Sequence, residues 1–559
     1  MQILHQVKNR VASHSYELIF LFMMILFTAL TKPPMLFDQF MWAEMATNYF
    51  KNAHLGFFEQ LMVTDYGYLQ FTQRFITYIG HILQIPTNLI PYFYNWSSLM
   101  MIFLILVPFI SSRYEVIIRE KSLRLAVVII IFLIADFESI NFISFSYFGL
   151  FLLLIESIRL YWTKKVIWYD YLLPFLFLSK PILLIFYPIY FVLLCHIRNK
   201  EFLAIFILIS ALAFLQINTA IDYVGSASLS TLNNSIEINS ENFIKALSLL
   251  LASLSKIFLY GFIHNFYLAL IFGFLLLVYL FKNFNQKNRI NLFIILVSTY
   301  GGILFNVLVL NNWQQPEAIY DRGFNRQNIF IYMNYILVIG IIINNIQSFI
   351  FFSSIKFFQK KKPLYLFLIV IIFNLLLPLH ILEKAFKINK PYLSGSSAWK
   401  NITNQDFSEY CYSINPNNWL FSNTNCKQFQ NPILKMKKHR TAKYFSKEKV
   451  NNIKIRVPRN SLPTELMGFK VSITYDEIIS IYNKPQISCE LFIFDDSDNL
   501  LAESSKIFMM RSGTGNIEFN FQPILLSGHD YMFELSCNKY FYYDNAQTDQ
   551  VNYFVLGKS

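Results

Sequence analysis

The feature that most constrains this chain is a series of apolar runs, each close to the ~20 residues that cross a bilayer core. The first run covers 16–31, and a mixed segment, 32–91, which is too polar for lipid, follows it. Further runs predict membrane spans at 92–111, 124–138, 142–161, 166–179, 182–197, 202–220, 262–281, 290–310, 329–350 and 364–382. We therefore expect a polytopic α-helical membrane protein with about eleven spans within residues 1–385. Lys180-Pro181 separates 166–179 from 182–197, and one long tilted helix there would change the count.

Composition agrees with this interpretation. Hydrophobic residues make up 55% of the 559 residues and charged residues only 14%, whereas soluble domains carry roughly 25% charged residues. These values exclude a disordered chain, a nucleic-acid-binding domain and an ordinary cytosolic enzyme. The mean hydropathy of +0.41 describes a chain that needs lipid to cover its apolar surface.

The net charge of +13 is explained by orientation. If the spans alternate, all basic clusters fall on one side of the membrane, and the positive-inside rule makes this the cytoplasmic side. These clusters lie near the N-terminus and at 112–124, 162–165, 198–200, 282–289 and 356–362. The other side receives 32–91, 139–141, 221–261, 311–328 and everything after 383. Because no exposed face combines basic residues with aromatic residues, we expect no nucleic-acid partner. No small-residue cleavage site follows the first run, so we expect an uncleaved first span.

The composition changes after about residue 385. A mixed connecting region, 386–450, leads into short alternating stretches, separated by turn signals, at 453–457, 469–473, 489–494, 517–521 and 531–535. This spacing predicts a small antiparallel β-sandwich over 451–559.

Four of the five cysteines lie in this tail, at Cys411, Cys426, Cys489 and Cys537. An even set in one soluble domain indicates disulfides and an oxidising compartment. Proximity in the chain favours the pairs Cys411–Cys426 and Cys489–Cys537. The alternative is four buried free thiols.

The first candidate functional residues follow the first span. Asp38 stands close to the membrane, and residues 37–53 form a predicted amphipathic surface helix that also contains Glu44. Asp38 is our candidate general base. The structural alternative is that Asp38 caps the surface helix.

Three other outer segments contain candidate residues. Asp136 and Glu138 occupy a short turn, where two carboxylates at i and i+2 suit a divalent cation or sugar hydroxyls. Arg322 and Arg326 suit a phosphate, although lipid headgroups or Asp321 would also pair with them. Lys180 is a further candidate for binding phosphate. Alternatively, its side chain extends along the apolar surface so that its ammonium group reaches water.

A second amphipathic segment, 69–85, follows the turn at Asp65. Arg74 in this segment would pair with an outer acid or with substrate. Packing explains Tyr66 and Tyr68 most simply, although sugars also stack on such rings.

The layout resembles the GT-C superfamily of integral-membrane glycosyltransferases, which use lipid-phosphate-linked sugars. Gly67-Tyr68-Leu69 followed by Gln73-Arg74-Phe75 is similar to the "GYL…R" stretch of bacterial O-antigen glucosyltransferases. Glu138-Ser139-Ile140-Asn141 with Phe145-Ser146-Tyr147 is similar to their "E…N…W" turn, and Asp321-Arg322-Gly323-Phe324 lies where they often have an Arg-Tyr stretch. The resemblance covers roughly residues 1–385.

The resemblance implies a glycosyltransferase that moves a sugar from a polyprenyl-phosphate donor to a periplasmic glycan such as O-antigen or another surface polysaccharide. The general base would be Asp38. The donor or the acceptor would be positioned by Asp136, Glu138, Glu44, Arg74 and Tyr68. The phosphate would be bound by Arg322, Arg326 and Lys180. The resemblance makes no cofactor certain, and Asp136 and Glu138 could hold a divalent cation, Mg²⁺ or Mn²⁺. The implied location is the bacterial inner membrane, with a cytoplasmic N-terminus, a periplasmic tail, and a sugar flippase and a donor synthase as partners.

Three alternatives stay open. A transporter or flippase would show internal repeats and a midplane site, and we find no convincing repeat. An O-antigen polymerase or ligase would depend on arginines in large outer loops more than on an early acid. A non-catalytic envelope scaffold would use its tail to bind glycan.

Overall fold

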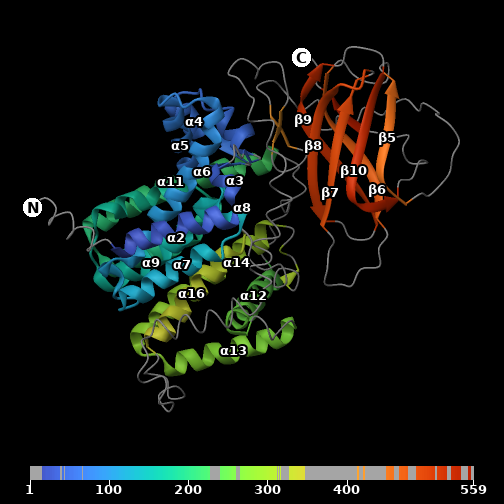
Figure 1. Cartoon of the computed structure of the whole chain (residues 1–559). Helices are drawn as coiled ribbons and strands as arrows, with labels where there is room; N and C mark the ends of the chain where they lie inside the picture. Colours follow the sequence, from blue (N-terminus) through green and yellow to red (C-terminus); the bar gives the residue numbers. More distant parts are fainter. Residues whose placement is uncertain are drawn as a thin grey trace, which may run out of the picture. The chain divides into compact units, whose positions relative to one another are not determined.

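A computed structural model describes residues 15–37, 41–42, 44–65, 67–226, 239–259, 265–310, 313, 315–316, 327–345, 412–414, 419–421, 449–458, 465–475, 486–495, 497–509, 513–525, 530–542 and 552–555. The chain forms two compact units (Figure 1). The helical unit comprises Met1–Pro33, Leu55–Ile79 and Tyr94–Ala385, and the mixed unit comprises Pro34–His54, Gly80–Phe93 and Phe386–Ser559.

The described part of the chain is mostly helical. Its α-helices are α2 (Ser15–Thr31), α3 (Pro33–Phe37), α4 (Phe57–Met62), α5 (Phe71–Ile82), α6 (Ile90–Leu106), α7 (Lys121–Leu133), α8 (Phe137–Ile140), α9 (Gly149–Thr163), α10 (Tyr187–Ile197), α11 (Lys200–Ser226), α12 (Ser240–Leu259), α13 (Phe266–Asn283), α14 (Gln286–Val309) and α16 (Ile329–Asn344). Short 3-10 or π segments are η1 (Met45–Phe50), η2 (Thr87–Leu89), η3 (Val107–Ile110), η4 (Ser112–Tyr114), η5 (Phe145–Phe148), η6 (Trp168–Leu178) and η7 (Pro181–Phe186).

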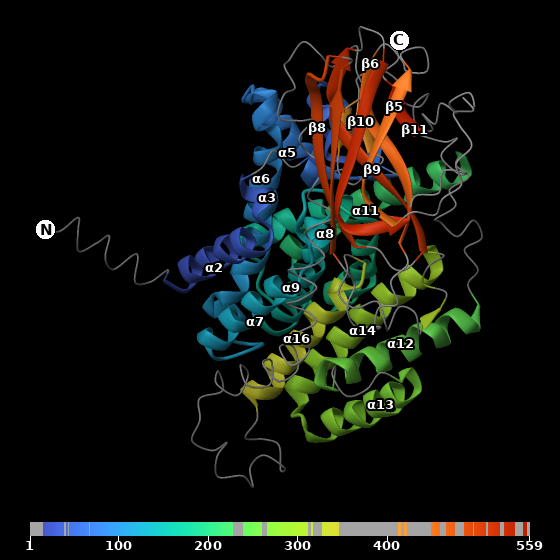
Figure 2. The ribbon, with the colours of Figure 1, turned by 45° about the vertical axis from the view of Figure 1, so that its right-hand side comes forward.

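The helices of the helical unit differ in how many of their side chains are buried. Nearly every side chain of α9 and α16 is buried, whereas α13 has only a few buried side chains. Neighbouring helices pack in the order α13, α12, α14, α16, α7, α2, and Figures 1 and 2 show α13 beside α12 at one end of this row. The core of the unit therefore lies around α16 and α9.

Five described helical segments are long and apolar enough to cross a membrane: Thr87–Ile110, Phe145–Thr163, Lys200–Ile221, Phe266–Asn283 and Gln286–Val309. Ser15–Thr31, Pro181–Ile197 and Ile329–Asn344 are shorter apolar helices. These helices indicate a membrane protein, as the sequence predicts. The predicted span 364–382 lies outside the described residues, and the count of about eleven stays a prediction.

Helix α13 exposes a broad apolar face, including Leu268, Ile271, Phe272 and Leu275. Such a continuous face is uncommon on a soluble monomer, but it suits a helix surrounded by lipid. This side of the helical unit is therefore the one that we expect to face acyl chains.

Gly273 permits a close approach of α13 to α12. A Cβ atom at this position would lie 1.8 Å from the main-chain oxygen of Leu251. At Gly301, by contrast, an added Cβ would meet its nearest neighbour, Ile185 Cβ, at 3.6 Å, which is an ordinary contact. Small residues serve in this way where membrane helices pack without a hydrophobic driving force between them.

We therefore expect Gly273→Ala to destabilise the protein by about 1–3 kcal/mol, because the two helices must separate to admit the methyl group. Gly301→Ala is the matched control and should leave stability unchanged or raise it by up to about 1 kcal/mol, because alanine is the better residue in a helix interior. Thermal unfolding of both purified variants in the same detergent measures the difference. Equal melting temperatures for the two variants would contradict the packing described for α12 and α13.

The mixed unit contains the described strands of the tail. These are β3 (Tyr412–Ile414), β4 (Trp419–Phe421), β5 (Lys449–Pro458), β6 (Glu465–Tyr475), β7 (Gln486–Phe494), β8 (Leu500–Met509), β9 (Gly513–Leu525), β10 (Asp530–Tyr542) and β11 (Asn552–Val555). All described pairings are antiparallel. Seven of these strands form two paired groups. One group has the order β8-β7-β10-β5 and the other has the order β9-β6-β11. The pairing of Tyr542 on β10 with Thr474 on β6 joins the two groups.

One face of β7 and β10 is buried. Leu491 and Ile493 on β7 and Phe533 and Leu535 on β10 are at most 2% exposed, and they alternate with more exposed neighbours. This is the period of two expected when one face of a sheet covers a core.

The cysteines fit this register. Cys489 is disulfide-bonded, and Cys537 stands opposite it in the pairing of β7 with β10. This arrangement is compatible with the predicted Cys489–Cys537 bridge. Cys411 and Cys426 lie outside the described residues, and Cys195 in α10 is a free thiol.

Candidate functional site

The predicted site residues divide into three groups. Asp38, Arg322 and Arg326 lie outside the described residues. Glu44 belongs to the mixed unit, where it precedes η1. The others, Tyr68, Arg74, Asp136, Glu138 and Lys180, all belong to the helical unit.

Asp136 begins the short helix α8. Its Oδ1 accepts hydrogen bonds from the main-chain N of Ser139 at 2.8 Å and from Ser139 Oγ at 2.5 Å. A side-chain oxygen that accepts from the main chain in this way is typical of an N-cap residue. Burial raises the pKa of the Asp136 carboxyl to about 6, and the charge on Glu138 adds to the rise, while Ser139 and Lys32 partly offset it. A carboxyl with this pKa is divided between its two forms close to neutral pH.

Lys32, directly after α2, is a cation that acts on Asp136, and it is not among the site residues predicted from the sequence. It is 1% exposed; its Nζ donates to Thr31 Oγ1 at 3.3 Å and lies 4.9 Å from the centre of the Phe27 ring. Burial lowers the pKa of the Lys32 ammonium to about 8, and the charge on Asp136 partly offsets this. A lysine at the end of a span normally extends to water, so a buried one is the signal of a functional residue.

Tyr68 and Lys180, which are far apart in sequence, meet in the structure. Strands β1 (Thr64–Asp65) and β2 (Tyr68–Leu69) form a hairpin, and Gly67 has a φ of 81°, which suits the third position of a type II turn. Lys180 Nζ donates to Tyr68 OH at 2.9 Å and lies over the rings of Tyr68 and Tyr147, at 4.8 and 5.7 Å from their centres. Cation–π contacts of this kind hold an ammonium inside a protein.

The first turns of helix α5 bury polar side chains. Gln73, Arg74 and Thr77 are at most 1% exposed, whereas Phe75 is 41% exposed. Gln73 Nε2 donates to Ile143 O and to Ser146 Oγ, both at 3.2 Å, so α5 is fixed to the turn that follows α8.

These contacts form a buried polar cluster at the turns of the helical unit. It contains Lys32, the 136–147 turn, the inner face of α5 and the Lys180–Tyr68 pair. Among the described residues, no group of three or more His, Cys, Asp or Glu side chains could hold a metal ion. Asp136 and Glu138 alone would be two ligands, and a bound cation would need more oxygen ligands than these two.

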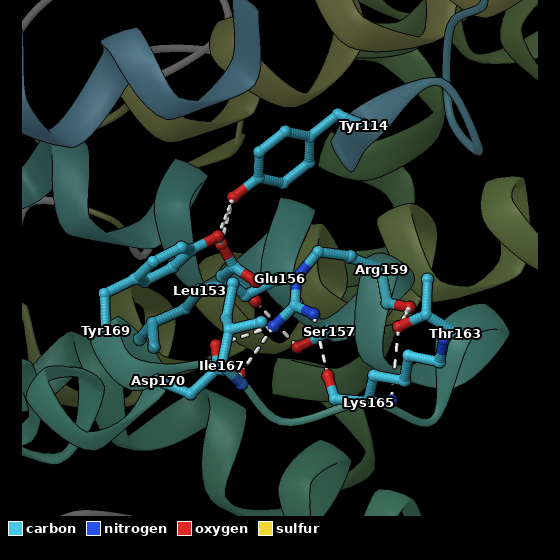
Figure 3. A network of polar contacts seen from close by, with 10 residues as sticks. All are labelled: Tyr114, Leu153, Glu156, Ser157, Arg159, Thr163, Lys165, Ile167, Tyr169 and Asp170. Carbon is cyan, nitrogen blue, oxygen red and sulfur yellow. Dashed lines mark hydrogen bonds and ion pairs between the residues drawn. The ribbon is translucent and has the colours of Figure 1, made fainter. Parts of the chain in front are cut away.

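A second buried cluster surrounds Arg159 and contains none of the site residues predicted from the sequence (Figure 3). Arg159 on α9 lies between two carboxylates: its Nε is 2.5 Å from Glu156 Oε2 and its Nη2 is 2.6 Å from Asp170 Oδ1. Tyr114 OH and Tyr169 OH both donate to Glu156 Oε1. The spacing Glu156-x-x-Arg159 inside an apolar run was the available signal, because charges in a span almost always have partners.

Comparison with known proteins adds no relative: no family model, no curated protein and no solved structure matches this chain.

The buried ammonium of Lys32 leads to a pH-dependent prediction. Because burial lowers its pKa in the folded protein, the charged form is penalised below about pH 8 and the penalty disappears as pH rises towards 10.5. Lys32→Met should therefore raise the free energy of unfolding at pH 7 by up to about 3 kcal/mol, and the gain should shrink between pH 8 and 10.5.

Unfolding in detergent at pH 7, 9 and 10.5 measures this gain. Lys121→Met is the control, since Lys121 pairs with Glu17 at 3.3 Å in a partly exposed position. A Lys32→Met gain that is absent, or that does not change with pH, would show that the ammonium is not destabilised by burial.

Proposed function

We propose that this chain is a membrane glycosyltransferase that moves a sugar from a polyprenyl-phosphate donor to a cell-envelope glycan. O-antigen and other surface polysaccharides are the acceptor class. The observation that carries the proposal is the buried polar cluster, in which two lysines and a carboxyl with a raised pKa lie at turns between apolar helices. Burying such groups is costly, and proteins retain them in membrane domains where they act.

The proposed reaction exchanges one C–O bond for another. An acceptor hydroxyl attacks the anomeric carbon, the bond from that carbon to the phosphate oxygen breaks, and polyprenyl phosphate leaves with the electron pair. The transition state of this bond exchange resembles an oxocarbenium ion. Asp38, assigned from its place in the sequence, takes the proton of the acceptor hydroxyl.

The charge that develops on the departing phosphate needs cations. Lys180 and Lys32 supply ammonium groups in the helical unit, and Arg322 and Arg326 are further cations assigned from sequence. Tyr68 holds Lys180 in place through the 2.9 Å hydrogen bond between them. Asp136 and Glu138 position the donor.

The finer architecture is also part of the proposal. We infer about eleven spans, a GT-C-like arrangement, a cytoplasmic N-terminus and a periplasmic tail, in a bacterial inner membrane. The two antiparallel groups of the tail would pack as a β-sandwich that binds the acceptor or braces the outer loops. A sugar flippase and a donor synthase would supply the substrate.

The proposal is tested by transfer with the purified protein in nanodiscs. Radiolabelled polyprenyl-phosphate hexoses and a lipid-linked glycan acceptor are supplied, and label on the acceptor is measured together with released polyprenyl phosphate. We expect both products to form in equal amounts.

Other outcomes identify other classes of protein. Label that crosses the bilayer of proteoliposomes without joining the acceptor would indicate a transporter. Acceptor glycans that become joined to one another, with no use of the labelled donor, would indicate a polymerase or ligase.

A further inference from the structure

Within the buried polar cluster, the turn after α8 contains polar side-chain atoms that no described residue satisfies. Asn141 Oδ1 accepts hydrogen bonds from the main-chain N of Ile143 at 3.1 Å and of Ser144 at 3.0 Å. These two donors fix the orientation of the amide, because only its oxygen can accept them. The amide nitrogen of Asn141 is therefore not used by the turn, and it has no hydrogen-bond partner among the described residues.

Gln73 presents the complementary atom. Its Nε2 donates to Ile143 O and Ser146 Oγ, which fixes the orientation of this amide as well. Its Oε1, a buried acceptor, has no hydrogen-bond partner in the described part of the chain. Gln73 is therefore bonded to the same turn that Asn141 begins.

Ser144 adds a hydroxyl group. It is 1% exposed, and its Oγ is also unpaired within the described ranges. The turn and the α5 side chain bonded to it thus combine a free amide donor, a free amide acceptor and a hydroxyl that can do both. Native proteins leave few buried polar atoms unmatched, and each one in a folded structure needs an explanation.

The chemistry of the three groups indicates their ligand. All three are neutral hydrogen-bonding groups, which favours a neutral ligand rich in hydroxyls over phosphate or a metal ion. A pyranose carries neighbouring hydroxyls that each donate and accept, which matches a donor and a hydroxyl on the turn and an acceptor on α5.

We propose that Gln73, Asn141 and Ser144 bind hydroxyl groups of the transferred sugar. This inference rests on the proposed function and names the part of the buried polar cluster that recognises the sugar, as distinct from the lysines that bind phosphate. Asn141 donates to one hydroxyl, Gln73 accepts from another, and Ser144 does either.

Binding of short-chain donors tests the proposal without requiring turnover. The full-length protein in nanodiscs is titrated with citronellyl phosphate and with citronellyl-phosphoryl glucose, galactose, mannose and N-acetylglucosamine. We expect at least one glycosylated compound to bind about 10-fold or more tightly than the bare phosphate. The same affinity for all five compounds would overturn the proposal.

Ser144→Ala is the decisive variant, because the Ser144 hydroxyl has no described partner within the protein and its loss should not disturb the fold. It should lower the preference for the sugar-bearing compound by about 3–10-fold, the usual range for one hydrogen bond, and leave the affinity for citronellyl phosphate unchanged. Asn141→Asp, which keeps the acceptor for the turn and removes the donor, should lower the same preference. Ser157→Ala is the matched control, since the Ser157 hydroxyl bonds to Leu153 O at 2.7 Å within α9.

The two proposals fail in distinguishable ways. Sugar-dependent binding that Ser144→Ala weakens, without any transfer, would leave the sugar site standing and exclude the glycosyltransferase. Transfer by the wild-type protein with a sugar preference that neither variant alters would exclude the sugar site, and the three polar atoms would then be matched by water alone.

Discussion

Replacing Asp38 by asparagine is expected to lower the rate of sugar transfer by about 10²–10⁴-fold, the usual contribution of a general base. Asparagine keeps the size and polarity of the side chain, but it cannot take the proton of the acceptor hydroxyl. The measurement is the initial rate of transfer at saturating donor and acceptor. Affinity for the donor should change little, because the lost interaction belongs to the transition state.

The control for Asp38→Asn is Glu59→Gln. Glu59 is an exposed acid on α4 whose Oε2 accepts from Gly56 N at 3.3 Å, so the same chemical change there should leave the rate within about twofold. If Asp38→Asn keeps the wild-type rate, Asp38 is not the base. Asp136→Asn would then be the next variant to assay, because the pKa of its carboxyl, about 6, suits a base near neutral pH.

Much of the helical architecture could be predicted from the sequence, because each apolar run is long and can be recognised without knowing what it packs against. The break at Lys180-Pro181 is real: η6 ends at Leu178 and η7 begins at Pro181. The alternating stretches 453–457, 469–473, 489–494, 517–521 and 531–535 all fall within described strands. Periodicity of two or of 3.6 is a local property, so a single sequence can show it.

The site was predictable only in part. Lys180 and Tyr68 were both selected, but their contact joins positions 112 residues apart and could not be read from either segment. Helix α5 was expected to be amphipathic, yet the sequence does not say that Gln73 and Arg74 face inward while Phe75 faces outward. Lys32 was overlooked because a lysine after an apolar run usually marks the membrane boundary.

The arginine–carboxylate cluster of α9 leads to the largest expected effect on stability. Arg159→Met should destabilise the protein by about 3–5 kcal/mol, because Glu156 and Asp170 would keep their buried positions without the cation between them. Asp170 would lose both contacts with Arg159 Nη2, at 2.6 and 2.7 Å, and the main-chain oxygen of Lys165 would lose its donor at 2.9 Å. Thermal unfolding in detergent measures the loss.

Two comparisons show whether the unbalanced charge is the cause. Arg113→Met removes an exposed guanidinium that lies 5.4 Å from the centre of the Tyr169 ring, and it should cost less than about 1 kcal/mol. The triple variant Arg159→Met, Glu156→Gln, Asp170→Asn removes all three charges and should recover part of the loss, since an uncompensated buried charge costs more than a neutral polar group. A triple variant less stable than Arg159→Met alone would mean that hydrogen-bond geometry, and not charge balance, holds η6 against α9.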